Sequence, residues 1–230
     1  MKTSILFLAL ISAMMPVITQ KTGLSKKHPL EFKMLCVFLF LAVGMLSALK
    51  VGTFTAYSIC ILSALVSGGL GDFFLSYKKN KFFMLGLAFF AIGHLIYSYT
   101  FLCQGSYSAS TYMIPVAIVT VVLTLSLFIF SKLRMKLGGK QIPFTVYGTV
   151  LAFFFTCAVA SGLVAIASGN IAFGLCLITG GILFSFSDLL IGAKFGGMRR
   201  PKIFHYFVSY TYFTAQTLFA LSILLQHGGL

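Results

Sequence analysis

Long runs of apolar residues, separated by short polar stretches, follow one another along the whole chain. A helix needs roughly 20 apolar residues to cross the hydrocarbon core of a bilayer, and the runs have about that length. The pattern predicts an all-α polytopic membrane protein that forms a single membrane domain over residues 1–230. We expect eight transmembrane helices, at approximately residues 4–19, 34–49, 54–76, 82–102, 111–131, 143–166, 170–192 and 204–225.

The composition favours a bilayer as the solvent of this chain. Hydrophobic residues make up 59% of it and charged residues 9%, and the mean hydropathy is +1.03. A net charge of +14 is typical of nucleic-acid-binding proteins, but the 17 Lys and Arg residues stand in short clusters between apolar runs. Clusters of this kind set membrane topology. We therefore expect no nucleic-acid partner.

Cations accumulate after the first, third, fifth and seventh expected helices. Fifteen of them lie there: Lys21, Lys26, Lys27, Lys33, Lys78, Lys79, Lys81, Lys132, Arg134, Lys136, Lys140, Lys194, Arg199, Arg200 and Lys202. Under the positive-inside rule these segments are cytoplasmic and both termini are not. The first apolar run also resembles a signal-peptide core, but its removal would put the Lys21 to Lys33 cluster on the wrong side. It is therefore expected to be a helix of the bundle.

Two of the three acidic residues, Asp72 and Asp188, interrupt otherwise apolar helices; the third, Glu31, precedes the second helix. An Asp inside a membrane helix costs about 2.5–3.5 kcal/mol and usually faces protein or water. Each Asp precedes a Lys by six residues, so both should lie ~9 Å inward of the cations. The strings D-F-F-L-S-Y-K and D-L-L-I-G-A-K indicate a parallel repeat of four helices. Alternatively, the two carboxylates reach interfacial water or pair with Lys78 and Lys194.

Other polar side chains recur at helical spacing. His94 and Tyr97 share one face of the fourth expected helix, and Tyr212 and Gln216 share one face of the eighth. Counting from the nearest cation places His94 ~20 Å deep, which predicts no contact with the carboxylates unless its helix is tilted. An interhelical hydrogen bond and a catalytic role both remain open for it. Carboxylates without His or Cys at ligand spacing make a poor metal site, so we expect no metal and no cofactor.

At these residues the chain resembles the YhhN-like family of integral membrane lysoplasmalogenases. The resemblance spans roughly residues 60–222 and rests on four short motifs: Gly71-Asp72, Gly93-His94 with Tyr97, Ser187-Asp188, and Tyr212 with Ala215-Gln216. It implies hydrolysis of the vinyl ether bond of lysoplasmalogens, with Asp72 and Asp188 as the catalytic acids. His94, Tyr97, Tyr212 and Gln216 would bind substrate or support the acids. The implied partners are a lysophospholipid within the bilayer and water as co-substrate.

The chemistry of a vinyl ether fits a pair of carboxyl groups. Its hydrolysis begins with protonation of carbon and passes through an oxocarbenium ion, so it needs a proton donor and an anionic base, as glycosidases do. Which Asp plays which part stays open at this point. Arg199, Arg200 and Lys202 are candidates for contacts with the substrate phosphate, or are ordinary topogenic charges. The resemblance implies the endoplasmic reticulum for a eukaryotic member and the inner membrane for a bacterial one.

Two other functions fit the same residues. Paired intramembrane acids and an apparent repeat also describe a proton-coupled transporter, in which Asp72 and Asp188 would relay protons. Against this, both acids lie toward one face of the membrane, whereas alternating access places its site at the midplane. In a lipid-binding or scaffold protein the acids would be structural and catalysis would be absent.

Overall fold

The computed structural model describes residues 2–23, 28–77, 79–103, 109–134, 141–195 and 203–226. Within these residues all regular structure is helical: α1 Lys2–Lys21, α3 Pro29–Val51, α4 Ala56–Leu75, α5 Asn80–Leu102, α6 Ala109–Arg134, α7 Gln141–Ala167, α8 Ile171–Phe195 and α9 Ile203–Leu225. All eight are long and apolar enough to cross a membrane. The predicted all-α fold with eight transmembrane helices is confirmed, with helix ends that differ from the expected ones by a few residues.

The link between α3 and α4 shows how short polar segments end these helices. Gly52 closes α3 with a φ of 85°, a left-handed conformation that glycine adopts without a steric penalty. Thr55 then begins α4, because its side-chain oxygen accepts a hydrogen bond from the backbone N–H of Ser58 at 3.2 Å. A helix expected at residues 54–76 therefore starts at Ala56.

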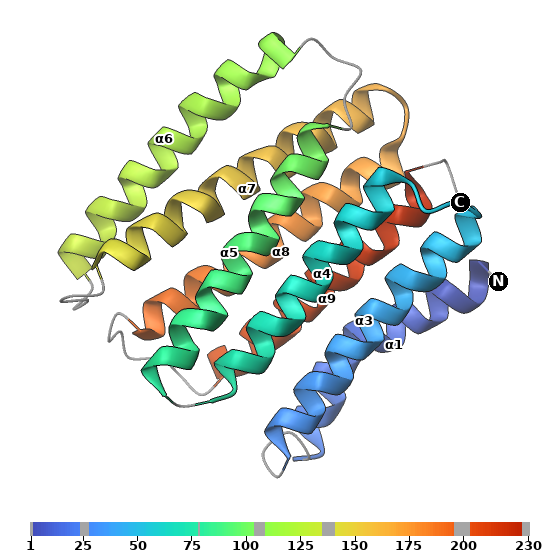
Figure 1. Cartoon of the computed structure of the whole chain (residues 1–230), viewed down its shortest axis with the longest axis horizontal. Helices are drawn as coiled ribbons and strands as arrows, with labels where there is room; N and C mark the ends of the chain where they lie inside the picture. Colours follow the sequence, from blue (N-terminus) through green and yellow to red (C-terminus); the bar gives the residue numbers. More distant parts are fainter. Residues whose placement is uncertain are drawn as a thin grey trace.

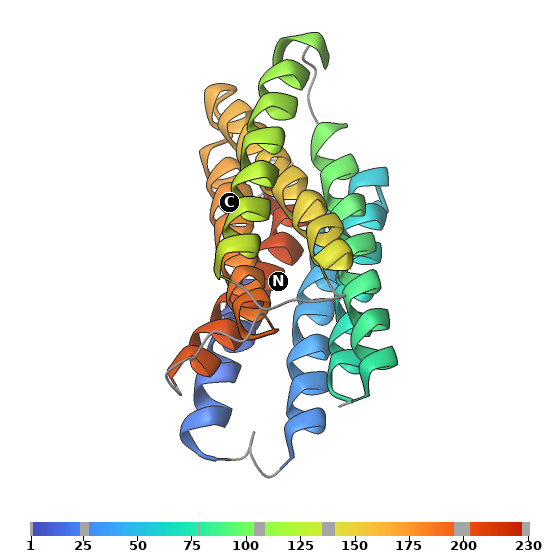
Figure 2. The same ribbon diagram turned by 90° about the vertical axis from the view of Figure 1, so that its left-hand side faces the viewer.

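The helices pack as two layers with one additional helix at an edge. α4 lies between α3 and α5 in one layer, and the other follows the order α7, α8, α9 and α1. Figure 2 shows the first layer on the right and α8 and α1 on the left. α3 packs on α9, and α5 packs on α7, so the two layers face each other. α6 packs on α7 alone among the described helices and lies at the outer edge of the bundle (Figure 1).

This packing has an internal two-fold relationship. A rotation that exchanges α3, α4 and α5 with α7, α8 and α9 also exchanges the α3–α9 contact with the α7–α5 contact. The relationship is incomplete among the described residues: α1 packs on α9 but α6 does not pack on α5, and α4 packs on α9 but α8 does not pack on α5. Neighbour relations thus support the predicted repeat for three helices of each half. They also place α4 and α8, which carry the two aspartates, in equivalent positions.

Small residues bring α4 and α5 close together. A Cβ added at Gly86 would lie 3.0 Å from the backbone oxygen of Gly71, and one added at Gly93 would lie 3.3 Å from that of Ala64. The hydroxyl of Ser67 donates across the same seam to the carbonyl of Phe89 at 2.7 Å. Close packing of small residues is the usual means of helix association in lipid. It fixes Asp72, next to Gly71, relative to His94, next to Gly93.

The centre of the bundle is an aromatic cluster. The Phe154 ring contacts the rings of Tyr97, Phe184 and Phe219 at centroid separations of 5.8, 5.6 and 5.9 Å, and all four side chains are almost fully buried. These residues come from α7, α5, α8 and α9. Because the cluster ties both layers together, the polar groups that lie beside it are held in fixed positions.

Candidate active site

Asp72 lies less than one turn before the end of α4, and its charged partner comes from α3. The Nζ atom of Lys33 lies 2.8 Å from Oδ1 of Asp72 and also donates to the backbone carbonyl of Asp72 at 3.2 Å. The Asp72 side chain is 4% exposed and that of Lys33 28%. An ammonium group at this distance favours the ionised form of the carboxyl group. The pair is neutral as a unit, which lowers the cost of placing it within a membrane helix bundle.

A chain of buried hydrogen bonds leads to Asp72 from the opposite side. The hydroxyl of Tyr97 donates to Oε1 of Gln216 at 2.8 Å, and Nε2 of Gln216 donates to the hydroxyl oxygen of Tyr212 at 3.0 Å. The Tyr212 hydroxyl, whose own proton is therefore free, lies next to the Asp72 carboxylate. Gly68 makes room for this chain, because a Cβ there would collide with Nε2 of Gln216. The donors run from Tyr97 through Gln216 to Tyr212, while Oδ2 of Asp72 has no hydrogen-bond partner of its own among the described residues.

Asp188 lies inside α8 and has neutral partners. Its Oδ2 atom accepts a short hydrogen bond from the hydroxyl of Tyr147 on α7. The same oxygen lies 3.5 Å from Nε2 of His94 on α5, and the side chains of His94 and Asp188 are 1% and 3% exposed. Nε2 of His94 is buried and makes no hydrogen bond among the described residues.

The other ring nitrogen of His94 determines which tautomer is present. Its Nδ1 atom lies 2.6 Å from the backbone carbonyl oxygen of Phe90. A carbonyl oxygen can only accept, so Nδ1 carries a proton and Nε2 of the neutral ring presents a lone pair to Asp188. Two acceptors facing each other in a buried site repel unless one proton lies between them. A proton on the carboxyl group or on the imidazole would remove this repulsion.

The two carboxyl groups belong to separate but adjacent environments. Their charges lie close enough to interact, yet the Phe184 ring stands between their partners, 4.6 Å from the His94 ring and 5.2 Å from the Tyr212 ring. Each Asp has one partner on the preceding helix of its own half of the bundle and one on a helix of the other half. Lys33 of α3 and Tyr147 of α7 thus come from corresponding helices of the two halves, as do Tyr212 of α9 and His94 of α5.

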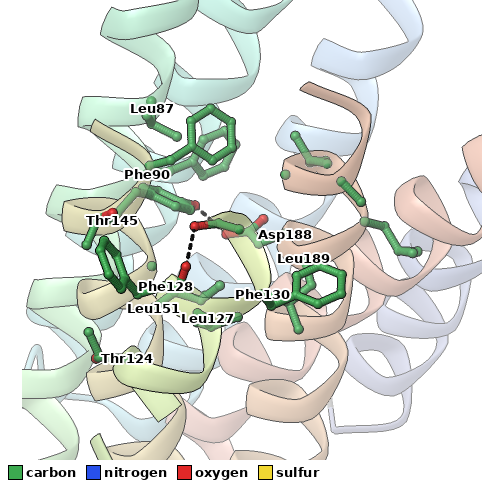
Figure 3. A pocket seen from close by; sticks show the side chains of 18 of the residues that line it. Leu87, Phe90, Thr124, Leu127, Phe128, Phe130, Thr145, Leu151, Asp188 and Leu189 are labelled. Carbon is green, nitrogen blue, oxygen red and sulfur yellow. Dashed lines mark hydrogen bonds between the residues drawn. The ribbon is translucent and has the colours of Figure 1, made fainter. Parts of the chain in front are cut away.

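A pocket of about 430 Å³ opens beside Asp188 and is enclosed mainly by α5, α6, α7 and α8. Figure 3 shows Asp188 among the side chains of Phe90, Leu127 and Leu189. Tyr147 also lines this pocket, whereas Asp72 does not. An occupant of the pocket would therefore meet the carboxyl group of Asp188 first.

One expectation for the site was wrong. His94 was expected to lie too deep to meet a carboxylate, but it contacts Asp188. The estimate assumed that helices run parallel, whereas α5 crosses α7 and α8 obliquely in Figure 1.

Sequence reasoning missed two partners of the aspartates. Lys33 stands within a cation cluster and was interpreted as topogenic, and Tyr147 is one of ten tyrosines and belongs to no motif. The alternative in which the aspartates pair with Lys78 and Lys194, and the proposed phosphate contacts of Arg199, Arg200 and Lys202, fall on side chains outside the described part of the chain. Within the described part, no three His, Cys, Asp or Glu side chains gather as metal ligands.

Comparison with known proteins identifies one family. A sequence model of the YhhN family matches residues 29–223. This range begins in α3 and ends in α9, so it contains both aspartates and all their partners described above. No curated protein and no solved structure matches the chain.

Proposed function

The chain belongs to the YhhN family, and we propose that it hydrolyses the vinyl ether bond of lysoplasmalogens. The products are a fatty aldehyde and glycerophosphoethanolamine or glycerophosphocholine. Family membership is consistent with a membrane hydrolase of this type. The observation that carries the proposal is the position of Asp188, which faces Nε2 of His94 at 3.5 Å and lies at the wall of an apolar pocket.

In this proposal Asp188 is the general acid. It has no cationic partner among the described side chains, and burial favours the neutral state, in which the carboxyl group keeps the proton and His94 accepts a hydrogen bond from it. After proton transfer the carboxylate that forms is stabilised by the Tyr147 hydroxyl. The contact of 3.5 Å with His94 is long, as catalytic contacts often are before substrate binds.

Asp72 is then the anionic member of the pair. The Lys33 ammonium favours its ionised form, so we assign to Asp72 the negative charge that opposes an oxocarbenium ion and the part of proton acceptor for water. Removing one charge of such a pair would leave the other unpaired in a buried site. The two environments therefore separate the roles of two chemically identical side chains.

The proposed reaction begins with proton transfer from Asp188 and ends with its return. Asp188 transfers its proton to the outer carbon of the vinyl group, and the ether carbon becomes an oxocarbenium ion. Water adds to that carbon and releases a proton to Asp72, which gives a hemiacetal. The hemiacetal hydroxyl loses its proton as the C=O bond of the aldehyde forms and the bond to the glycerol oxygen breaks, and the glycerol oxygen takes up one proton to give the alcohol. The proton on Asp72 returns through solvent to Asp188, so the net reaction consumes one water molecule.

A comparison of three lysophospholipids tests the function. The purified protein in detergent is given a vinyl ether lipid, the saturated alkyl ether of the same chain length and the acyl ester. We expect aldehyde from the vinyl ether alone, because only that bond forms an oxocarbenium ion on protonation of carbon. Fatty acid released from the ester, or no product from a folded protein, would refute the proposal. Uptake driven by a pH gradient in liposomes, without hydrolysis, would support the transporter instead.

A further inference from the structure

The pocket beside Asp188 has the size of one lipid chain. Its volume is about 430 Å³. A group the size of water or methylene occupies on the order of 30 Å³, so the pocket has room for one long hydrocarbon chain. Its wall is formed largely by leucine and phenylalanine side chains, among them Leu87, Leu127, Phe128, Phe144 and Leu151.

Most polar groups along this wall are already bonded within the protein. The Ser131 hydroxyl donates to the carbonyl of Phe128 and accepts from Nε2 of Gln141, both at 2.8 Å. The Thr145 hydroxyl donates to the backbone carbonyl of Gln141 at 2.9 Å. Apart from Thr124, whose hydroxyl finds no partner among the described residues, the wall away from Asp188 and Tyr147 offers hydrocarbon contacts.

The pocket faces the bilayer between α6 and α8. Phe130 of α6 and Phe186 and Leu189 of α8 line it and are nevertheless 46%, 46% and 45% exposed. Within the described residues α6 does not pack on α8, so these three side chains border an opening between the two helices. The three residues lie within the membrane-spanning segments of α6 and α8. The opening therefore faces lipid.

We propose that this pocket is a binding site for the single hydrocarbon chain of a lysolipid, which enters sideways from the bilayer between α6 and α8. This inference rests on the proposed function and adds where the chain lies and why one chain is accepted. Transfer of a chain from lipid to an apolar pocket gains little free energy, because both surroundings are apolar. The pocket therefore selects lipid chains by steric fit. A larger side chain in its wall should weaken binding of the chain.

Gly148 is the position at which to add that bulk. A Cβ at Gly148 would lie 3.6 Å from Cδ1 of Leu127, an ordinary contact, so Gly148→Leu fits the backbone and extends into the pocket. Val146→Leu on the same helix is the matched control, because Val146 is 59% exposed. If Gly148→Leu fails to fold, Gly192→Leu takes its place, since a Cβ there is 3.6 Å from Phe144 on another part of the wall.

The probe is a saturated alkyl lysophospholipid that carries a diazirine near the end of its chain and cannot be hydrolysed. We expect photolabelling of α6 and α7 peptides that line the pocket. An unlabelled lysolipid should compete and a two-chain phospholipid should not. Gly148→Leu should lower the labelling several-fold, and Val146→Leu should leave it unchanged. Labelling that is reduced neither by the unlabelled lysolipid nor by Gly148→Leu would overturn the inference.

The labelling does not depend on turnover, so the two proposals fail separately. A pocket that is labelled in a protein without aldehyde release would refute the hydrolase while the chain site stands. Aldehyde release by a protein whose pocket is not labelled would refute the chain site alone.

Discussion

His94 Nε2 lies 3.5 Å from Asp188 Oδ2, and the backbone carbonyl of Phe90 fixes the tautomer that turns the lone pair of His94 toward the carboxyl group. This relationship distinguishes the two aspartates. Asp188 faces an imidazole, whereas Asp72 forms an ion pair with an ammonium group. In the proposed mechanism these different environments give the two identical side chains different protonation states.

Replacement of His94 by phenylalanine tests this relationship. Phe keeps the ring that packs against Phe154 and Phe184, both 4.6 Å away, but removes the acceptor for the proton of Asp188. We expect kcat to fall by about 10- to 100-fold, below the full effect of a lost general acid, with KM nearly unchanged. The pH dependence of kcat should also change. Phe154→Leu disturbs the same packing and should lower kcat without changing the pH dependence; if both variants behave alike, His94 is structural.

Tyr147→Phe removes one hydroxyl and retains the ring. The Asp188 carboxylate formed on proton transfer loses its hydrogen bond, and a bond to a charged group is worth about 1.5–3 kcal/mol. We expect kcat for aldehyde release to fall by roughly 10- to 100-fold while the thermal unfolding temperature changes little. Tyr99→Phe, at a tyrosine that is 64% exposed on α5, is the control. Full activity of Tyr147→Phe would show that this hydroxyl does not assist Asp188.

Lys33→Met should destabilise the protein. It leaves the Asp72 carboxylate buried without its cation, and because Lys33 is partly exposed we expect a loss of about 1–3 kcal/mol. The measurement is thermal unfolding in detergent. Adding Asp72→Asn to Lys33→Met should cost little more, since the unpaired charge is gone. Lys50→Met, at the other end of α3 and exposed, should have no effect, and a similar loss in Lys50→Met would mean that the ion pair is not the cause.

The sequence predicts the fold well because a membrane restricts the possibilities. Backbone groups in lipid must bond internally, so each long apolar run is a helix. The small residues of α4 and α5, such as Gly71 and Gly86, are also recognisable as close-packing positions. The side of the membrane on which each terminus lies stays a prediction from the positions of the cations.

The site is predictable in part. Asp72 and Asp188 stand out because an acid in an apolar helix is costly. Lys33 does not stand out, because nothing in a cluster of cations shows which lysine side chain turns inward. It also precedes residue 60, where the recognisable motifs begin. The His94 contact depends on the crossing angle of α5, which residue counting cannot supply. The family match, which starts at residue 29, includes the helix that carries Lys33.

The three acidic residues of the chain provide the most direct test of a two-aspartate mechanism. Aldehyde release from a lysoplasmalogen is measured for Asp72→Asn, Asp188→Asn and Glu31→Gln, with folding followed in parallel. Glu31 is exposed and pairs with His28 at 2.9 Å, so Glu31→Gln should be as active as the wild type. We predict that each Asp variant folds and loses at least about 10²-fold in kcat. Aldehyde release at the wild-type rate by either Asp variant would contradict the account.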